Sequence, residues 1–241
     1  MNPKALVTTA KDLSSEWFEK HGWDIILYGS DSKKEYEIVY FRDPFNDDTV
    51  SEESVRTSLA NIHGSRSIDG IESFEDMLSC EDKYNQYQLY RDWMPATFLP
   101  SETQFVQGRH LAKKRISQRA KDILFDITDV EIDDNWIFQE TMDIVEELRV
   151  YVVLGNVIPQ ASIKSSKING KVKVIGKKDL SEKELEFCKE ISDKSGLDFI
   201  GIDVAVLSNG SLKLIEVNRS PQFKKFVELY GEAPLLGILD I

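Results

Sequence analysis

Two short apolar runs near the C-terminal end of the chain are separated by Asn209-Gly210. An Asn-Gly pair between such runs predicts a tight β-hairpin, because both residues tolerate the positive φ angles of a type I′ turn. With these two residues at the centre of the turn, Ser208 is expected to pair with Ser211. The rest of the chain is interpreted around this hairpin.

Two acidic residues face each other in the predicted hairpin. Counting outward from the turn places Asp203 opposite Glu216, and Asn218 follows two residues later on the same face. Facing carboxylates repel each other, so the arrangement predicts a cation between them. Carboxylate and amide oxygens are the ligands that Mg²⁺ prefers, with substrate phosphates completing its shell. The alternative is a surface hairpin with unrelated acids, but the apolar neighbours favour a buried site.

The N-terminal part alternates apolar runs with amphipathic stretches. Strands are predicted over residues 4–9, 24–28 and 37–41, and helices over 12–22, 51–62, 71–78 and 84–93. The order strand, helix, strand indicates an α/β unit whose sheet is at least partly parallel. Polar loops are predicted at 42–48 and 63–67. Their arginines, Arg42 and Arg66, are either substrate contacts or solvated loop residues.

A second hairpin is predicted further along the chain. Strands over residues 147–154 and 157–164 flank a turn at Gly155-Asn156. This turn places Arg149 opposite Ser162, with Lys164 as a diagonal neighbour on the same face. The two cations either complement the acidic hairpin or are solvated charges on an open sheet face.

A capping box at Ser181–Glu184 begins one more helix, which Gly196 ends. We expect this helix to pack on the sheet without taking part in chemistry.

The chain has 241 residues, enough for one large domain or two small ones. Its formal net charge of −12 argues against a dedicated duplex nucleic-acid binder. Residues 111–121 form the only strongly basic segment. A polyanion contact is expected there, with the triphosphate of ATP as the simplest candidate and a solvated loop or an RNA contact as alternatives.

The remaining composition indicates a cytoplasmic protein. Cys80 and Cys188 are far apart and show no ligand or redox spacing, so both are expected to be reduced. The three histidines are scattered, which disfavours a zinc site. The chain start does not resemble a signal peptide, and no run approaches the ~20 apolar residues of a membrane span. A membrane partner is not expected.

The ordered motifs resemble the ATP-grasp superfamily, most closely the ribosomal-protein glutamate ligase (RimK) type and the microviridin-type peptide ligases. The closing signature of these proteins, an aspartate strand followed by Glu-Val-Asn-x-Ser-Pro, matches Asp203 and residues 216–221. The resemblance implies that Asp203, Glu216 and Asn218 hold Mg²⁺. Arg219, inside the signature, is expected to contact phosphate or a substrate carboxylate.

The resemblance also implies a set of nucleotide-binding residues. Lys83 precedes a Pro-x-Thr segment at 95–97, and Lys113 precedes the loop that covers the phosphates. The expected nucleotide contacts are Lys83, Lys113, Gln139, Glu140, Thr141, Met142 and Glu147, with Glu147 at the ribose. Arg149 and Lys164 are expected at the phosphates or the substrate.

The implied fold is α/β (α+β), an ATP-grasp fold with a small N-terminal α/β domain at residues 1–80. The ATP-grasp domain then covers residues 81–241, with a reduced lid subdomain at about 96–142. The chain departs from the family pattern in two ways. Its phosphate loop, 116–122, has no glycine, so Arg119 or Lys121 is expected to compensate, and the segment from Lys113 to Glu140 is short. Lys114 is the alternative to Lys113.

The implied function is an ADP-forming, ATP-dependent carboxylate–amine ligase that acts through an acylphosphate. ATP and Mg²⁺ are the expected cofactors, and a peptide, a protein or a small amino acid is the expected substrate. The alternatives are a non-catalytic ATP-binding or regulatory module and an ATP-grasp kinase. The sequence leaves the acceptors and the oligomeric state open, a homo-oligomer included.

Overall fold

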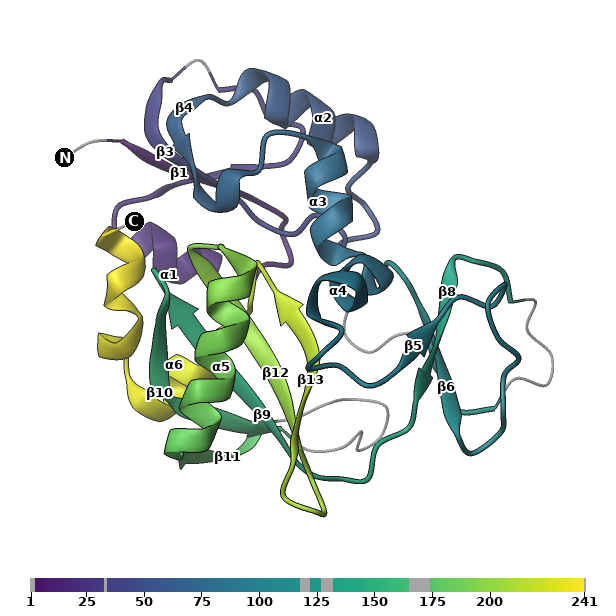
Figure 1. Ribbon diagram of the computed structural model, residues 1–241. Helices are drawn as coiled ribbons and strands as arrows, with labels where there is room; N and C mark the ends of the chain where they lie inside the picture. Colours follow the sequence, from purple (N-terminus) through teal and green to yellow (C-terminus); the bar gives the residue numbers. More distant parts are fainter. Residues whose placement is uncertain (1–2, 33, 118–121, 127–131, 165–173, 241) are drawn as a thin grey trace.

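The computed structural model describes residues 3–32, 34–117, 122–126, 132–164 and 174–240. It contains three sheets (Figure 1). The N-terminal sheet is parallel with the order β2-β1-β3-β4, formed by β1 (Lys4–Thr8), β2 (Asp24–Leu27), β3 (Tyr36–Phe41) and β4 (Gly64–Ser67).

Apolar residues on both faces of the N-terminal sheet explain its place inside an α/β unit. Alternate residues of β1 enter two different cores: Leu6 packs with Trp17 and Phe18, whereas Ala5 and Val7 pack with Val55 and Met77. Strands buried on both faces read as continuous apolar runs, which is why they are visible in the sequence. The helices of this unit are α1 (Ser15–Lys20), α2 (Glu52–Asn61), η1 (Ile68–Gly70) and α3 (Phe74–Glu81).

One element of this unit was predicted wrongly. Residues 63–67 were expected to form a loop, but Gly64–Ser67 form β4, the edge strand beside β3. The sequence Gly-Ser-Arg-Ser has no apolar residue, and the strand is largely exposed. It is held by backbone pairing with β3 and by polar side-chain contacts, such as that of Ser67 Oγ with Ile71 O at 2.9 Å, so no hydrophobic pattern indicates it.

The second sheet is small and antiparallel, with the order β5-β8-β6-β7, and we call it the lid sheet because it lies in the segment for which a lid subdomain is predicted. Its strands are β5 (Thr97–Phe98), β6 (His110–Lys114), β7 (Ile123–Leu124) and β8 (Trp136–Glu140). Ala112, Trp136 and Phe138 form its own core. Helix α4 (Lys83–Tyr90) precedes it in the chain. The two expected compensating residues of the phosphate loop, Arg119 and Lys121, lie outside the described residues.

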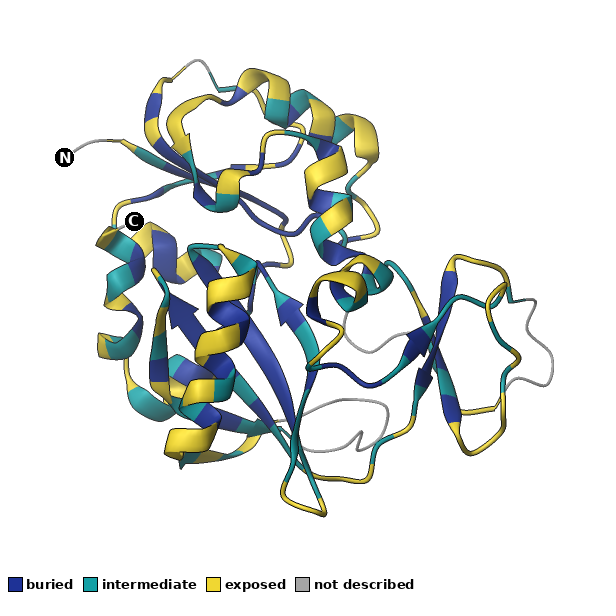
Figure 2. Cartoon of the chain, in the orientation of Figure 1, coloured by how far each residue is buried: buried dark blue, intermediate teal, exposed yellow. Residues whose placement is uncertain are grey.

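The third sheet is antiparallel, with the order β11-β10-β9-β12-β13. Two of its inner strands contribute many buried residues (Figure 2). The strands are β9 (Ile144–Val153), β10 (Asn156–Lys164), β11 (Val174–Asp179), β12 (Phe199–Leu207) and β13 (Leu212–Asn218). The remaining elements are α5 (Glu182–Ser195), α6 (Lys224–Tyr230) and η2 (Ala233–Asp240). Helix α5 begins with the predicted capping box and ends at Gly196 in the left-handed region.

The turn between β12 and β13 is one residue longer than predicted. The amide of Leu207 donates to Ser211 O at 2.9 Å, so the pair Ser208–Ser211 is not formed. A bulge next to Asp203 shifts the register back by one residue. Asp203 therefore still lies opposite Glu216, as predicted.

The turn between β9 and β10 also differs by one residue. It lies at Leu154-Gly155, whose φ angles are 50° and 72°, and not at Gly155-Asn156. An irregularity between Val157 and Ala161 restores the expected register. Arg149 consequently lies opposite Ser162, as predicted.

The N-terminal unit and the third sheet share one apolar core. Phe18 and Tyr40 from the first unit pack in the same cluster as Tyr151, Phe199 and Phe223 from the second. None of the helices in the described part of the chain has both the length and the apolar character needed to cross a membrane.

Polar contacts extend this interface at its edge. Asp69, in η1, accepts hydrogen bonds through Oδ1 from the backbone amides of Asp198 at 2.8 Å and Phe199 at 3.3 Å. Arg66 forms an exposed ion pair with Asp198 at 2.9 Å, so it serves this contact and is not a solvated loop residue. The second carboxyl oxygen of Asp69 is buried without a hydrogen-bond partner.

The substitution Asp69→Asn is expected to stabilise the protein above neutral pH. Burial raises the pKa of Asp69 to about 7, although Arg219 and the two backbone amides act in the opposite direction. When the pKa of a carboxyl is higher in the folded state, the free energy of unfolding of the protein falls as the pH rises from about 4 to about 7. Asparagine keeps the acceptor, tolerates the φ of 62° and does not ionise.

Urea unfolding of both proteins at several pH values measures this effect. We expect a gain on the order of 1 kcal/mol at pH 8 and a smaller difference near pH 4. A variant with the same pH dependence as the original chain would contradict the assignment.

Candidate active site

Charged side chains from β9, β10 and β12 meet on one face of the third sheet. The Arg149 guanidinium donates to both carboxylate oxygens of Asp203, with Nη2 2.6 Å from Oδ2. Lys164 Nζ lies 2.7 Å from Asp203 Oδ2 and 2.5 Å from Glu147 Oε1. Arg149 Nη2 is also 3.9 Å from Glu216 Oε1. The Arg149 guanidinium, from the neighbouring strand β9, therefore contacts both of the facing acids.

The charge of Asp203 is fixed by these partners. Its side chain is 1% exposed. Burial alone would raise the pKa of Asp203, but the fields of Arg149 and Lys164 and their hydrogen bonds outweigh it and hold the pKa well below its usual range. For Lys164 the signs are reversed: burial alone would lower its pKa, but the negative charge of Asp203 outweighs burial and raises it. The group is a buried ion cluster at every physiological pH.

Glu216 and Asn218 are more accessible than Asp203. The Glu216 side chain is 33% exposed, and Asn218 Nδ2 donates to Glu216 Oε1 at 3.2 Å. Within the described ranges, no three His, Cys, Asp or Glu side chains are grouped as a metal site. A carboxylate and an amide nevertheless fit Mg²⁺ that arrives with a nucleotide, because Mg²⁺ takes one or two protein oxygens and completes its shell with phosphates and water.

Lys113 is buried beside a neutral partner. It is 9% exposed, and its ammonium donates to Gln139 Oε1 at 2.8 Å. Burial lowers the pKa of Lys113 to about 8, with Lys83 acting in the same direction and Glu216 and Glu147 against it. Because Glu216 and Glu147 act on the Lys113 ammonium, the end of strand β6 and this face of the third sheet lie at one site. A phosphate group would supply the negative charge that the Gln139 amide cannot.

Lys83 reaches the same region from the start of α4. Its ammonium donates to Ser117 O at 2.7 Å, and its backbone amide donates to Arg115 O at 3.0 Å. Arg115 in turn donates to both oxygens of Asp82. These contacts connect the end of β6 with the first turn of α4, so Lys83 and Lys113 lie in neighbouring parts of the structure.

The predicted adenine-binding residues lie where the lid sheet continues into β9. Gln139 is 1% exposed, and its amide nitrogen donates to Thr97 Oγ1 at 3.0 Å. Glu140 pairs with Arg109 at 3.0 Å, and the Thr141 hydroxyl donates to backbone carbonyls of the preceding loop. Met142 is half-buried in the same link. The structure thus places this segment next to Lys113 in the lid sheet.

Arg219 occupies a different environment from the one expected. It is 1% exposed, Nη1 donates to Phe41 O at 2.6 Å, and its ion pair, at 3.7 Å, is with Glu81. Its own carbonyl accepts from the Tyr40 hydroxyl at 2.6 Å. The structure brings Arg219 to the interface with the N-terminal unit and not into the Arg149–Asp203 ion cluster.

Arg42 makes the reciprocal contact from the N-terminal unit. It is 1% exposed and donates through Nη2 to Ser220 O at 3.1 Å and Pro221 O at 3.0 Å. Its Nε lies 2.6 Å from Asp12 Oδ2. Arg42 is therefore neither a solvated loop residue nor exposed to a substrate. Together, Arg42 and Arg219 clasp the end of β3 to the end of β13, and we call this contact the arginine clasp.

Glycine at position 201 permits the close packing under the site. A Cβ atom added there would lie 2.7 Å from Pro221 Cβ and 3.2 Å from Arg149 Cδ. Any larger residue would displace the signature proline or the arginine that pairs with Asp203. The Gly-x-Asp sequence at the start of β12 is therefore a packing requirement of the site.

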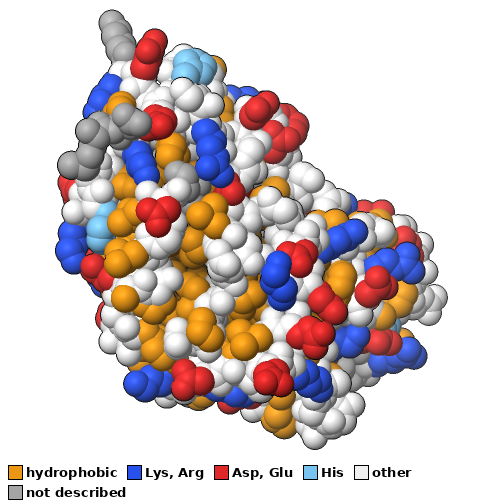
Figure 3. All heavy atoms as spheres, turned by 60° about the vertical axis from the view of Figure 1, so that its left-hand side comes forward, with side chains coloured by type: hydrophobic (Ala, Val, Ile, Leu, Met, Phe, Trp, Pro, Cys, Tyr) orange, Lys and Arg blue, Asp and Glu red, His pale blue; other side chains and the backbone are white. Residues whose placement is uncertain are grey.

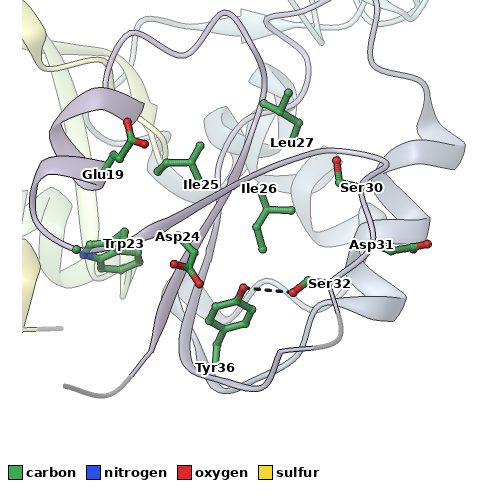
Figure 4. Close-up of a pocket in the computed structure, with 11 residues that line it drawn as sticks. Glu19, Trp23, Asp24, Ile25, Ile26, Leu27, Ser30, Asp31, Ser32 and Tyr36 are labelled. Atoms are coloured by element: carbon green, nitrogen blue, oxygen red, sulfur yellow. Dashed lines mark hydrogen bonds between the residues drawn. The ribbon is translucent and has the colours of Figure 1, made fainter.

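A hollow of the N-terminal unit lies away from this site. It measures about 710 Å³ and runs along the edge strand β2, between Trp23, Ile25 and Tyr36 (Figure 4). None of the predicted site residues lines it. Figure 3 shows one face of the molecule, with apolar side chains gathered over its middle and charged side chains around them.

Sequence reasoning missed one buried polar residue beside the site, Gln86. It is 8% exposed and contacts the backbone of Val217. Its position, three residues after Lys83 and four before the buried Tyr90, places it on the inner face of α4. That spacing was visible in the sequence, but a polar residue at such a position carries no distinctive pattern.

Comparison with solved structures gives the class of the fold. The chain resembles the ATP-grasp ligase PsnB complexed with precursor peptide PsnA2 and AMPPNP, with a TM-score of 0.60, 16% identity, and coverage of 99% of this chain and 97% of that chain. It resembles the RiPP-associated ATP-grasp ligase of Chryseobacterium gregarium with a TM-score of 0.65, 15% identity, and coverage of 99% and 96%. It resembles the macrocyclase MdnC bound with precursor peptide MdnA, from Microcystis aeruginosa MRC, with a TM-score of 0.62 and 15% identity. This match covers 99% of this chain and 98% of that chain. The fold is therefore an ATP-grasp fold.

The family follows from the sequence itself. Residues 99–232 match the model of the RimK-like ATP-grasp domain, and the chain belongs to this family. Its members are ATP-dependent ligases that form C–N bonds and release ADP. A search of curated proteins gave no match.

Proposed function

We propose that this protein is an ADP-forming carboxylate–amine ligase that uses ATP and Mg²⁺ and acts on a peptide. The observation that carries the proposal is the ion cluster of Arg149, Asp203 and Lys164 beside the accessible Glu216. An ATP-grasp site needs cations for the phosphates and oxygens for the metal, and this face of the sheet provides both.

Each predicted site residue has a role in this proposal except Arg219, which contacts Phe41 and Glu81 at the interface with the N-terminal unit. Glu216 and Asn218, with Asp203 behind them, would hold Mg²⁺, which would neutralise charge on the β- and γ-phosphates. Lys83 and Lys113 would bind phosphate, and Glu147 the ribose. Gln139, Glu140, Thr141 and Met142 would border the adenine. Arg149 and Lys164 would stabilise the phosphoryl group during transfer.

The chemistry requires no nucleophile from the protein. A substrate carboxylate oxygen attacks the γ-phosphorus of ATP, the bond from that phosphorus to the bridging oxygen breaks, and ADP leaves. An amine nitrogen then attacks the acyl carbon, phosphate leaves, and the nitrogen loses a proton. Catalysis consists of positioning the reactants and neutralising their charge.

A peptide substrate is supported by the fold relatives, since PsnB and MdnC were solved with precursor peptides. We place the domain division at residues 1–80 and 81–241, with the lid at about 96–142. We also propose a cytoplasmic location, where ATP is available.

The test of this function is ADP release with pools of amino acids and peptides, combined with mass spectrometry of the products. A ligase gives a product that has lost one water, whereas a kinase gives a stable phosphorylated product. Nucleotide binding without ADP release for any acceptor would indicate a regulatory module and overturn the proposal.

Lys113→Met is expected to lower the affinity for ATP by roughly 10- to 100-fold, since a hydrogen bond to a charged group is worth about 1.5–3 kcal/mol. In the original chain, affinity should also fall as the pH rises past about 8, because the free protein then loses the proton of Lys113. Calorimetric titration with ATP from about pH 7 to about pH 9.5 measures both effects. The variant should lack the pH-dependent step, and a step that persists would assign the titration to another group.

A further inference from the structure

Gln86 makes an unusual contact with the strand that carries the metal-binding residues. Its side-chain oxygen accepts from the Val217 amide at 3.0 Å, and its side-chain nitrogen donates to Val217 O at 3.0 Å. The same nitrogen donates to Cys80 O at 2.8 Å. The Gln86 amide is 8% exposed and has partners for both its oxygen and its nitrogen.

This contact replaces a missing strand. β13 is at the edge of the third sheet, so the backbone groups that point away from β12 have no strand to pair with. An antiparallel neighbour would exchange an N–H···O bond and an O···H–N bond with one residue. The carboxamide of Gln86 makes this same pair of bonds with Val217. Figure 1 shows α4 lying beside the end of β13.

The position of Val217 gives the contact its meaning. Val217 lies between Glu216 and Asn218, whose side chains point to the opposite face of the strand. On its other side the strand pairs with β12 through Ile202. The backbone between the two predicted metal ligands is therefore held from both sides, and its freedom to rotate is removed.

The helix that holds this strand also carries a phosphate-binding candidate. Lys83 lies three residues before Gln86 in α4, which places the two side chains on neighbouring turns of one face. The distance between Lys83 and the pair Glu216 and Asn218 is thus set through one short helix and one carboxamide.

We propose that Gln86 is a positioning residue, which holds Glu216 and Asn218 in the orientation that binds the metal–nucleotide complex and fixes their place relative to Lys83. The proposal rests on the proposed function only in that the ligand is a metal–nucleotide complex. It predicts an effect on metal affinity that a general loss of stability does not produce.

The chain offers matched variants. Gln86→Leu removes both hydrogen bonds without adding charge, and Gln86→Glu keeps the shape but turns a carboxylate oxygen toward the carbonyls of Val217 and Cys80. Gln88→Glu is the control, because Gln88 is exposed on the same helix. Circular dichroism and thermal unfolding establish that each variant is folded at the temperature of the assay.

The measurement is Mn²⁺ binding in the presence of AMPPNP, followed by electron paramagnetic resonance, together with the affinity for AMPPNP without metal. We expect Gln86→Leu and Gln86→Glu to bind Mn²⁺ at least about 10-fold more weakly, a loss of about 1.4 kcal/mol or more. Their metal-free nucleotide affinity should change less than about 3-fold, and Gln88→Glu should behave as the original chain.

Unchanged Mn²⁺ affinity in a folded Gln86 variant would overturn the proposal, as would an equal loss of metal-free nucleotide affinity. Should neither variant fold, amide hydrogen exchange of residues 212–221 in the original chain decides. We expect protection at Val217 that exceeds that of the exposed turn and increases when Mn²⁺ and AMPPNP bind. An unprotected Val217 amide would refute the contact. A chain that binds Mn²⁺–AMPPNP in this way but forms no product would leave the positioning role intact and remove the ligase function.

Discussion

Glu216→Ala is expected to abolish nucleotide-dependent ADP release while the protein stays folded. Glu216 is one-third exposed, and in the described part of the chain its side chain forms a hydrogen bond with Asn218 at 3.2 Å and an ion pair with Arg149 at 3.9 Å. After its removal Arg149 keeps both bonds to Asp203, and Lys113 keeps its hydrogen bond to Gln139. We expect the free energy of unfolding to change by less than about 1 kcal/mol.

The effect on turnover should be large. In the proposed site, Glu216 is the most accessible carboxylate that would hold the metal. The metal charge in turn would stabilise the phosphoryl group during its transfer. Loss of one such electrostatic contribution commonly costs about 10²–10³ in rate, and loss of the metal costs more. ADP release under saturating Mg²⁺ and ATP measures it, with Glu228→Ala, an exposed position on helix α6, as a control. Full activity in Glu216→Ala would sink the assignment of this site.

Asp203→Asn is expected to have the opposite balance, with a large effect on folding as well as on activity. Asp203 is 1% exposed and neutralises Arg149 and Lys164 together. Removal of one partner of a buried ion pair destabilises a protein by about 3–5 kcal/mol, because the remaining charge is buried without compensation. Glu147 stays paired with Lys164 and should reduce the loss toward the lower end.

The pH dependence gives this prediction a second check. The folded-state pKa of Asp203 is depressed, so its contribution is present above its unfolded pKa and is lost as the pH falls toward the folded value. The difference in unfolding free energy between the two proteins should therefore be largest near neutral pH and shrink below about pH 4. Urea unfolding of both proteins at about pH 7 and about pH 3 tests this. Equal stability at neutral pH would mean that the two cations have other partners.

The register of the site was predictable from the sequence, although both turns were placed wrongly by one residue. In each hairpin an irregularity in one strand cancelled the error of the turn, so Asp203 faces Glu216 and Arg149 faces Ser162. The side chains at the site alternate with buried apolar residues, and that alternation fixes which face they occupy. A one-residue slip would expose the apolar residues, and a bulge avoids this.

Sequence patterns did not predict the tertiary contacts. The burial of Arg42 and Arg219 depends on the meeting of two units that are about 180 residues apart in the chain, and no local pattern distinguishes a buried arginine from an exposed one. Gln86 was missed for the same reason. The pairing of Arg149 with Asp203 followed from neither hairpin alone, because it needs β9 beside β12.

The arginine clasp has a consequence for motion. Its donors bind backbone carbonyls of both units, and an apolar core continues beneath it, so polar and apolar contacts together join the N-terminal unit and the third sheet into one base. The lid sheet has a separate small core and reaches this base through polar contacts such as Arg115–Asp82 and Lys83–Ser117. A displacement of the lid sheet would therefore break polar contacts such as these, whereas a displacement of the N-terminal unit would also expose the shared apolar core.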